Sequence, residues 1–293
     1  MSVVSTNSAI ADIPLHREPS AGPNEPPAVI VQPLAREFMP LPGAPRLSAA
    51  SGQALRALEV MDESGEHRTI QLPLERPLLV RLDGRAVAKL WTLGARPEWL
   101  VLGYLRNRCR MSDVTHLETI TVDWAAGVAN VMTRAEFRGE ADPSSAMDDF
   151  PPMCRGQARI SRSRLRVLLA STESSGAIYR AAGSVQGCAL FQASNLWLSV
   201  EDVSRRNSFD IITGWMALHG VSGGDKVLFT TGRLTAEVVM KAAFNGIPIV
   251  VCGKGLTATC VDLAKTLGMT LIGHTARGRY ICYAGAERFD ADH

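Results

Sequence analysis

The chain has 293 residues, of which 46% are hydrophobic and 20% charged, so it can bury the cores of two globular domains. Its 31 basic and 29 acidic side chains give a formal net charge of +2, too small for a surface that coats a polyanion, so nucleic acid is not an expected partner. Its six cysteines include no Cys-x-x-Cys pair, which argues against a zinc ribbon or a disulfide scaffold and favours reduced thiols in the cytoplasm. Neither a secretory leader nor a run of about 18 apolar residues is found, so no membrane association is expected.

Proline marks the first expected boundary, since nine of the sixteen prolines precede residue 46. We expect residues 1–65 to form a Pro-rich disordered arm, either a solubilising extension or a partner-docking segment. Residues 66–140 are typical of a small α+β domain, with strands around a turn at Asp83-Gly84 and a helix within 95–111. A polar segment without periodicity follows at 141–162, and we expect a flexible loop that carries Cys154.

Residues 163–293 are predicted to form an α/β domain with a mixed, partly parallel sheet. A helical stretch, weakened at Gly176, precedes a strand hairpin that turns at residues 193–195, and the next helix ends at Gly220. From residue 225 to residue 273 the pattern alternates strand, helix, strand, helix and strand with short loops. Such alternation implies parallel strands joined by crossover helices.

Two loops in this domain follow predicted parallel strands and precede helices, which is where open α/β sheets bind ligands. One loop holds Gly232 and Arg233, and the other, at residues 252–257, holds Lys254. Glycine lets the backbone approach an anion, and the cations add charge beside a helix N-terminus. The loops either bind an anion or are ordinary turns with solvated cations. The motifs GxxxxGK[ST] and GxGxxG are absent, which disfavours a typical ATPase or nicotinamide dehydrogenase.

Two other charged segments are candidates for the same site. At the boundary of a strand and a helix, Glu201, Asp202, Arg205 and Arg206 form either the polar wall of a pocket or a solvated helix start capped by Ser204. The second segment follows the last parallel strand. It either binds a phosphate group or the edge of a nucleobase, or it is only a basic turn between two strands. Its residues are His274, Thr275, Ala276, Arg277, Gly278 and Arg279.

Cys154 is the best candidate for a reactive thiol, because it lies in a polar loop beside Arg155 and thiols react when they are exposed and their pKa is lowered. The alternative is an incidental loop cysteine. Cys188, Cys260 and Cys282 are expected to be inert core residues. No metal site is predicted, because the six histidines are scattered and the Pro-Cys-x-x-Cys element of zinc deaminases is missing.

Several short motifs resemble a known family when they are taken together. Residues 229–237 have the sequence FTTGRLTAE, residues 201–207 the sequence EDVSRRN, and residues 102–108 the sequence LGYLRNR. Over about residues 66–290 the chain resembles the FdhD family, the accessory sulfurtransferases of molybdenum- or tungsten-dependent formate dehydrogenases. This resemblance implies a cytoplasmic homodimer whose C-terminal domain is similar to cytidine deaminases but lacks deaminase chemistry.

The resemblance also implies a function. Members of the family accept sulfur from a cysteine desulfurase onto a loop cysteine as a persulfide. They bind the bis(molybdopterin guanine dinucleotide) molybdenum cofactor, which GDP-like nucleotides mimic, and pass it the sulfur that the formate dehydrogenase catalytic subunit needs. Cys154 takes the place of the persulfide carrier, although many members have Cys-x-x-Cys there. Gln186 and Arg206 stand where the family has histidine, and Ser204 where it has glycine.

The expected function is therefore sulfur transfer through a Cys154 persulfide to the bound molybdenum cofactor. One alternative is a non-catalytic cofactor-binding chaperone that has lost sulfur transfer with its second loop cysteine, and a more remote one is an unrelated nucleotide-binding α/β enzyme. The expected cofactor-binding residues are His274, Thr275, Ala276, Arg277, Gly278, Arg279, Gly232, Arg233, Glu201, Asp202, Arg205 and Arg206.

Overall fold

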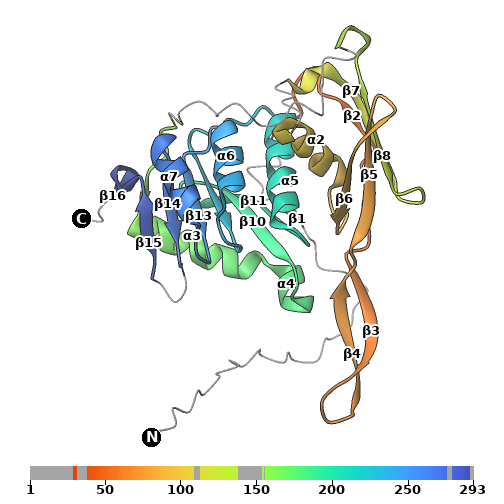
Figure 1. Ribbon diagram of the computed structural model, residues 1–293, viewed down its shortest axis with the longest axis horizontal. Helices are drawn as coiled ribbons and strands as arrows, with labels where there is room; N and C mark the ends of the chain where they lie inside the picture. The colour runs from red at the N-terminus through yellow and green to blue at the C-terminus, as the bar shows by residue number, and fades with distance from the viewer. Residues whose placement is uncertain are drawn as a thin grey trace, which may run out of the picture.

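The computed structural model describes residues 29–31, 38–108, 113–137, 154, 156–275 and 279–290. These residues form a mixed α/β structure with one five-stranded and one seven-stranded sheet, as Figure 1 shows. Among the described helices, none has the length and apolar character needed to span a membrane.

The five-stranded sheet has the strand order β2-β7-β8-β5-β6 and packs against helix α2 (Pro97–Arg108). Its hairpin between β5 and β6 turns at Asp83 and Gly84, whose φ angles are +47° and +81°. Asp-Gly favours such a turn because both positions need positive φ, so this prediction is confirmed. The strands are β2 (Arg46–Leu47), β5 (Arg76–Leu82), β6 (Arg85–Thr92), β7 (Leu117–Asp123) and β8 (Val128–Thr133). The 3-10 helices η1 (Val114–His116) and η2 (Ala135–Phe137) flank β7 and β8.

Three strands lie within the segment that we expected to be a disordered arm. Strand β1 (Val29–Val31) pairs with the edge of the seven-stranded sheet, and β2 pairs with β7. Strand β3 (Leu55–Met61) pairs with β4 (His67–Pro73) in a hairpin that extends from the five-stranded sheet (Figure 1). The expectation is corrected for these strands, because pairing with another strand satisfies backbone groups that local composition does not reveal. Residues 1–28 and 32–37 of the expected arm lie outside the described residues.

The seven-stranded sheet has the order β1-β11-β10-β12-β13-β14-β15, and β12, β13 and β14 are parallel, as predicted. The hairpin of β10 and β11 runs antiparallel to this parallel part. A separate parallel pair joins β9 (Ile160–Ser161) to β16 (Phe289–Asp290), beside the 3-10 helix η4 (Ala286–Arg288). The remaining strands are β10 (Gln186–Gln192), β11 (Asn195–Asp202), β12 (Lys226–Thr230), β13 (Ile249–Cys252), β14 (Thr270–Gly273) and β15 (Ile281–Ala284).

Helices cover both faces of the seven-stranded sheet (Figure 1). On one face, α5 (Arg205–Leu218), α6 (Ala236–Phe244) and α7 (Ala258–Thr266) bury one set of alternating strand residues. On the other face, α3 (Arg162–Ser175) buries the intervening set. The helix α4 (Ala177–Ala182) continues from α3 after a break at Gly176, as predicted. Because both faces are covered, the parallel strands β12, β13 and β14 consist mostly of apolar residues.

Helices α2 and α5 join the two sheets by packing backbone against backbone. A Cβ atom added at Gly103 of α2 would overlap the carbonyl oxygen of Asp210, and one added at Gly214 of α5 would overlap the carbonyl oxygen of Trp99. Two glycines facing each other therefore allow the close crossing, which fixes the relative position of α2 and the helices that border the candidate site.

Candidate functional site

The carboxyl ends of four strands meet at one edge of the seven-stranded sheet. Strand β11 runs antiparallel to β10, and β10 runs antiparallel to β12, so β11, β12, β13 and β14 all end at this edge while β10 begins there. Backbone hydrogen bonds connect the loops at this edge. Thr231 N donates to Gly187 O over 3.0 Å, and Gly253 N donates to Thr230 O over 3.0 Å. The edge therefore brings together the two glycine-containing loops and the start of α5, as the sequence predicted.

A cavity of about 410 Å³ lies at this edge, and we call it the basic pocket. Among the residues that the structure describes, the lining includes four cationic side chains and no carboxylate. The lining residues are Gln186, Ser204, Arg205, Arg206, Arg233 and Lys254. Helices α5, α6 and α7 begin at the same edge, and neither Thr235 nor Thr257 caps its helix through its side chain. Helix N-termini carry partial positive charge and N–H donors, so the pocket is suited to a multiply charged anion.

Gly232 lets the loop after β12 approach this pocket closely. A Cβ atom at this position would lie 3.0 Å from Gln186 Oε1 and 3.1 Å from Arg205 Cδ. The structure thus brings together four expected site residues, Gly232, Arg233, Arg205 and Arg206. Lys254, noted in the second loop, joins them, whereas Gln186 and Ser204 were not among the expected cofactor-binding residues. Gln186 reaches the pocket only because β10 is antiparallel, and no local sequence pattern encodes that placement.

Glu201 and Asp202 do not line the basic pocket, which corrects the expected polar wall for these two residues. Both are buried. The Glu201 carboxylate accepts hydrogen bonds from the backbone N–H groups of Ile178 and Tyr179 over 2.8 and 2.9 Å and so holds the start of α4. Burial raises the pKa of Glu201, and the backbone N–H donors oppose that rise.

Asp202 is bound by donors from the five-stranded sheet and from α5. Asp202 Oδ2 accepts hydrogen bonds from Thr92 Oγ1 over 2.6 Å and from Leu93 N over 3.2 Å. Asp202 Oδ1 accepts a hydrogen bond from Asn207 Nδ2 over 2.8 Å. Burial raises the pKa of Asp202 to about 6, although these hydrogen bonds favour its charged form. Asp202 therefore ties β11 and α5 to the first sheet and has no free face toward a ligand.

The described residues of the basic turn after β14, His274, Thr275 and Arg279, lie at the same edge but are not among the residues that line the basic pocket. His274 is exposed, and its Nδ1 shares a hydrogen bond of 2.6 Å with the hydroxyl of Tyr283. Thr275 is buried and donates to the carbonyl oxygen of Cys252 over 3.1 Å. Arg279 is exposed just before β15. The other three expected residues, Ala276, Arg277 and Gly278, lie outside the described residues.

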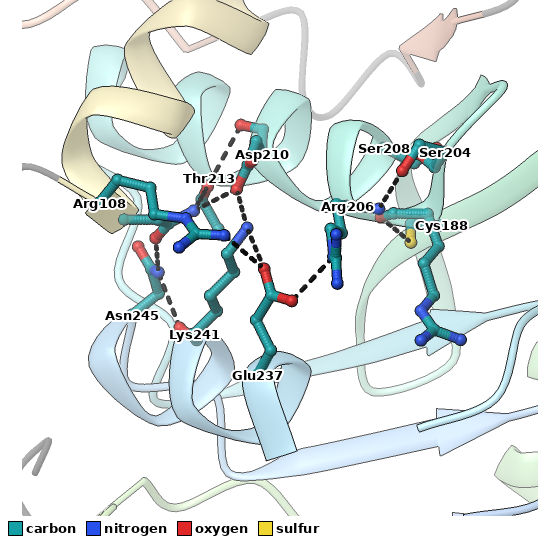
Figure 2. A network of polar contacts seen from close by, with 12 residues as sticks. Arg108, Cys188, Ser204, Arg206, Ser208, Asp210, Thr213, Glu237, Lys241 and Asn245 are labelled. Carbon is teal, nitrogen blue, oxygen red and sulfur yellow. Dashed lines mark hydrogen bonds and ion pairs between the residues drawn. The ribbon is translucent and has the colours of Figure 1, made fainter. Parts of the chain in front are cut away.

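A network of charged and amide groups lies behind the basic pocket (Figure 2). Lys241 Nζ lies 2.8 Å from Asp210 Oδ1, and both side chains are only 3% exposed. Asn107 Nδ2 donates to the same Asp210 oxygen over 2.6 Å. On α6, the Glu237 carboxylate pairs with Arg206 Nε over 2.8 Å. The network connects α2, α5 and α6, and a second cavity of about 400 Å³ beside it shares Ser204 and Arg206 with the basic pocket.

Cys154 differs from the exposed, low-pKa thiol that we expected. It is 5% exposed, its backbone N–H donates to Leu267 O over 2.8 Å, and Arg288 Nη2 donates to its carbonyl oxygen over 3.2 Å. Burial raises the pKa of its thiol, and the backbone N–H of Gly156 and the charge of Arg288 only partly oppose that rise. The thiol is therefore mostly protonated at neutral pH in this conformation. Most of the expected flexible loop, residues 141–153 and 155, lies outside the described residues.

Cys154 also lies at the opposite edge of the sheet from the basic pocket. It lines a separate cavity of about 600 Å³ together with Gly224, which precedes β12, and Gly246, which precedes β13. The strands in between have four or five residues, which at about 3.3 Å per residue separate the two edges by roughly 15 Å. Helices α5, α6 and α7 end at this second edge, and helix C-termini disfavour a thiolate. A small swing of the Cys154 side chain cannot reach the basic pocket.

The other described cysteines also have raised thiol pKa values. Cys188, Cys252 and Cys260 are buried, and Cys282 is partly exposed. Burial raises the pKa of Cys188 to about 12 and that of Cys252 to about 11. The same cause raises the pKa of Cys260 and Cys282.

Comparisons with known proteins agree with the resemblance noted from the motifs. The model of the FdhD/NarQ family matches residues 73–290. A relative named sulfur carrier protein FdhD, from Halalkalibacterium halodurans, is 26% identical over an alignment of length 255 that covers 80% of this chain and 93% of the relative. The protein of the same name from Bacillus subtilis is 25% identical over an alignment of length 248 that covers 77% of this chain and 94% of that one.

A solved structure has the same fold. It is that of a candidate formate dehydrogenase accessory protein from Desulfotalea psychrophila, with a TM-score of 0.68 and 23% sequence identity. The match covers 80% of this chain and 98% of that one. Because the family model covers most of this chain, the protein belongs to the FdhD/NarQ family.

Proposed function

We propose that this protein is a sulfur carrier that assists the maturation of a formate dehydrogenase and binds the enzyme's molybdenum cofactor in the basic pocket. The observation that carries the proposal is the pocket itself, in which Arg205, Arg206, Arg233 and Lys254 meet at the start of three helices and no carboxylate stands among the described lining residues. A bis(molybdopterin guanine dinucleotide) cofactor carries two pyrophosphate groups, and arginine side chains bind such groups through paired N–H donors. The names of the relatives support the sulfur-carrier role.

In this proposal Cys154 carries the sulfur. Its thiolate attacks the terminal sulfur of a persulfide on the donor, an S–S bond forms at Cys154, the donor S–S bond breaks, and the donor leaves as a thiol. The resemblance to the family supplies the rest of the proposal: a cysteine desulfurase as donor, the formate dehydrogenase catalytic subunit as client, a homodimer and a cytoplasmic location. Because Cys154 is buried and has a raised pKa, the transfer requires a movement that exposes it.

The position of Cys154 favours a second candidate function. A thiol that is 5% exposed, at the edge opposite the basic pocket, is not poised to react or to reach a bound cofactor. The second candidate is therefore a chaperone that binds and delivers the cofactor without transferring sulfur. The two functions share the basic pocket and differ only in the need for Cys154.

Substitution of Cys154 separates these candidates. For the Cys154→Ala variant, sulfur carriage predicts no uptake of radiolabelled sulfur from a desulfurase and no activation of formate dehydrogenase, with GDP binding unchanged by calorimetry. The matched control is Cys282→Ala, which removes a partly exposed thiol on β15 and should be labelled like the wild type. Full client activation by Cys154→Ala would refute the sulfur-carrier role and leave the chaperone.

Substitution of pocket cations tests the binding site itself. Arg233→Ala and Lys254→Ala should each weaken GDP binding about 10- to 100-fold, the usual range for a lost hydrogen bond between charged groups. Arg166→Ala removes an exposed cation on α3, on the other face of the sheet, and should leave GDP affinity unchanged. Unchanged affinity in both pocket variants would show that the nucleotide binds elsewhere.

A further inference from the structure

Glu237 lies in the first turn of α6 and its carboxylate faces three cations, as Figure 2 shows. Its Oε2 lies 2.8 Å from Arg206 Nε, and its Oε1 lies 3.3 Å from Arg108 Nη2 and 3.6 Å from Lys241 Nζ. Arg206 is one of the four cations that line the basic pocket. One of the four described pocket cations is therefore already paired with a carboxylate of the protein.

Arg206 differs in this respect from the other pocket cations. In the described part of the chain, Arg205, Arg233 and Lys254 have no ion-pair partner, so their charges are available to a ligand. The pair between Arg206 and Glu237 is partly solvated, with the side chains 60% and 22% exposed. Such a pair has a small net stability and can exchange one partner for another.

Glu237 retains other partners when Arg206 leaves it. Lys241 is buried and already paired with Asp210 over 2.8 Å, and it still lies within 3.6 Å of Glu237. Arg108, at the end of α2, also faces the carboxylate. Release of Arg206 therefore does not leave a buried carboxylate unpaired, which keeps the cost of the exchange low.

We propose that Glu237 competes with the ligand of the basic pocket for Arg206 and so limits the affinity of the pocket for diphosphate groups. A diphosphate that enters the pocket draws the Arg206 guanidinium away from Glu237, so part of its binding free energy is spent on breaking that ion pair. A carrier protein must release its ligand to the enzyme that receives it, and competition from Glu237 keeps binding in the basic pocket reversible. The inference rests on the proposed function of the basic pocket as a polyanion site.

The test measures binding of inorganic pyrophosphate to the full-length chain by calorimetry. Glu237→Gln keeps the shape of the side chain and removes its charge, and we expect pyrophosphate to bind about five-fold more tightly, the effect of freeing an arginine from a partly exposed ion pair. The gain should shrink as salt is raised, because screening weakens exposed charge interactions. Glu63→Gln, in the turn between β3 and β4, changes the net charge equally and should not change the affinity.

A double variant shows whether the effect acts through Arg206. We expect pyrophosphate affinities within about two-fold of each other for Arg206→Ala and Arg206→Ala/Glu237→Gln. Without Arg206, Glu237 no longer competes with the ligand for a cation. Glu237→Ala serves as a second variant, and unchanged unfolding midpoints establish that each protein is folded. Wild-type or weaker affinity in both Glu237 variants, or a gain that persists without Arg206, would overturn the inference. Absence of any pyrophosphate binding by the wild type would instead refute the proposed pocket and the inference with it.

Discussion

The buried pair of Asp210 and Lys241 provides the sharpest test of the packing behind the basic pocket. Both side chains are 3% exposed, and their charged atoms lie 2.8 Å apart. Substitution Lys241→Met keeps much of the apolar volume of the lysine stem and removes the charge. It leaves the Asp210 carboxylate in the core with Asn107 Nδ2 as its remaining side-chain donor on the same oxygen.

The expected magnitude follows from the burial of that carboxylate. Removing one partner of a buried ion pair costs about 3–5 kcal/mol, because the other charge stays in a medium of low polarity. At about 2–4 °C per kcal/mol for chains of this size class, the loss corresponds to a fall of roughly 6–20 °C in the unfolding midpoint. Asp210→Asn combined with Lys241→Met removes both charges and should recover a large part of the loss.

The stability loss of Lys241→Met should depend on pH, because Asp210 can take up a proton. Burial raises the pKa of Asp210, and Lys241 is the main group that opposes the rise, so in Lys241→Met the pKa of Asp210 rises further. A carboxyl with a raised folded-state pKa stabilises the protein at pH below its unfolded value and loses that contribution as pH rises through the folded value. The deficit of the variant should therefore be smaller at pH 5 than at pH 8.

Urea unfolding, followed by circular dichroism and by tryptophan fluorescence, measures these free energies. Lys265→Met on α7 is the matched control, because Lys265 is exposed and its loss should cost less than about 0.5 kcal/mol. A loss below about 1 kcal/mol in Lys241→Met, or a double variant no more stable than the single one, would refute the reasoning.

Three further predictions concern other parts of the molecule. Gly103→Ala should destabilise the fold by at least about 3 kcal/mol because a methyl group overlaps the Asp210 backbone, and an unchanged thermal midpoint would contradict this packing. Wild-type stability should fall by roughly 2 kcal/mol between pH 4 and pH 7 from Asp202 alone, whose pKa rises from 3.8 to about 6 on burial, and Asp202→Asn should lack this decline in urea titrations. Iodoacetamide should alkylate Cys154 far more slowly in the native protein than in urea, as peptide mass mapping can establish, and equal rates would argue that the thiol is exposed.

Local sequence patterns were sufficient for most of the fold around the basic pocket. The alternation of apolar strands and amphipathic helices between residues 225 and 273 predicted β12, α6, β13, α7 and β14, because each element buries its own periodic face. The same alternation placed Gly232, Arg233 and Lys254 at the carboxyl ends of parallel strands. The Asp83-Gly84 turn was likewise predictable, since its geometry depends on those two residues.

Tertiary structure alone decided which candidate residues meet. Strand order and direction bring Gln186 into the basic pocket, and pairing between distant segments turns β1, β2 and β3 into strands. Glu201 and Asp202 lie in a charged segment that suggested a ligand wall, yet their partners in α4 and the first sheet hold them in the interior. These contacts join residues far apart in the chain, so no local periodicity can encode them.

For the cysteines, too, the sequence and the tertiary structure supply different information. The sequence by itself determined that no Cys-x-x-Cys pair exists and that Cys154 is the one cysteine of the polar loop. Only the tertiary structure decided that its thiol is buried at the edge opposite the basic pocket, where helices α5, α6 and α7 end. The reactivity of a thiol depends on its solvation and on the charges around it, and both are properties of the packed chain.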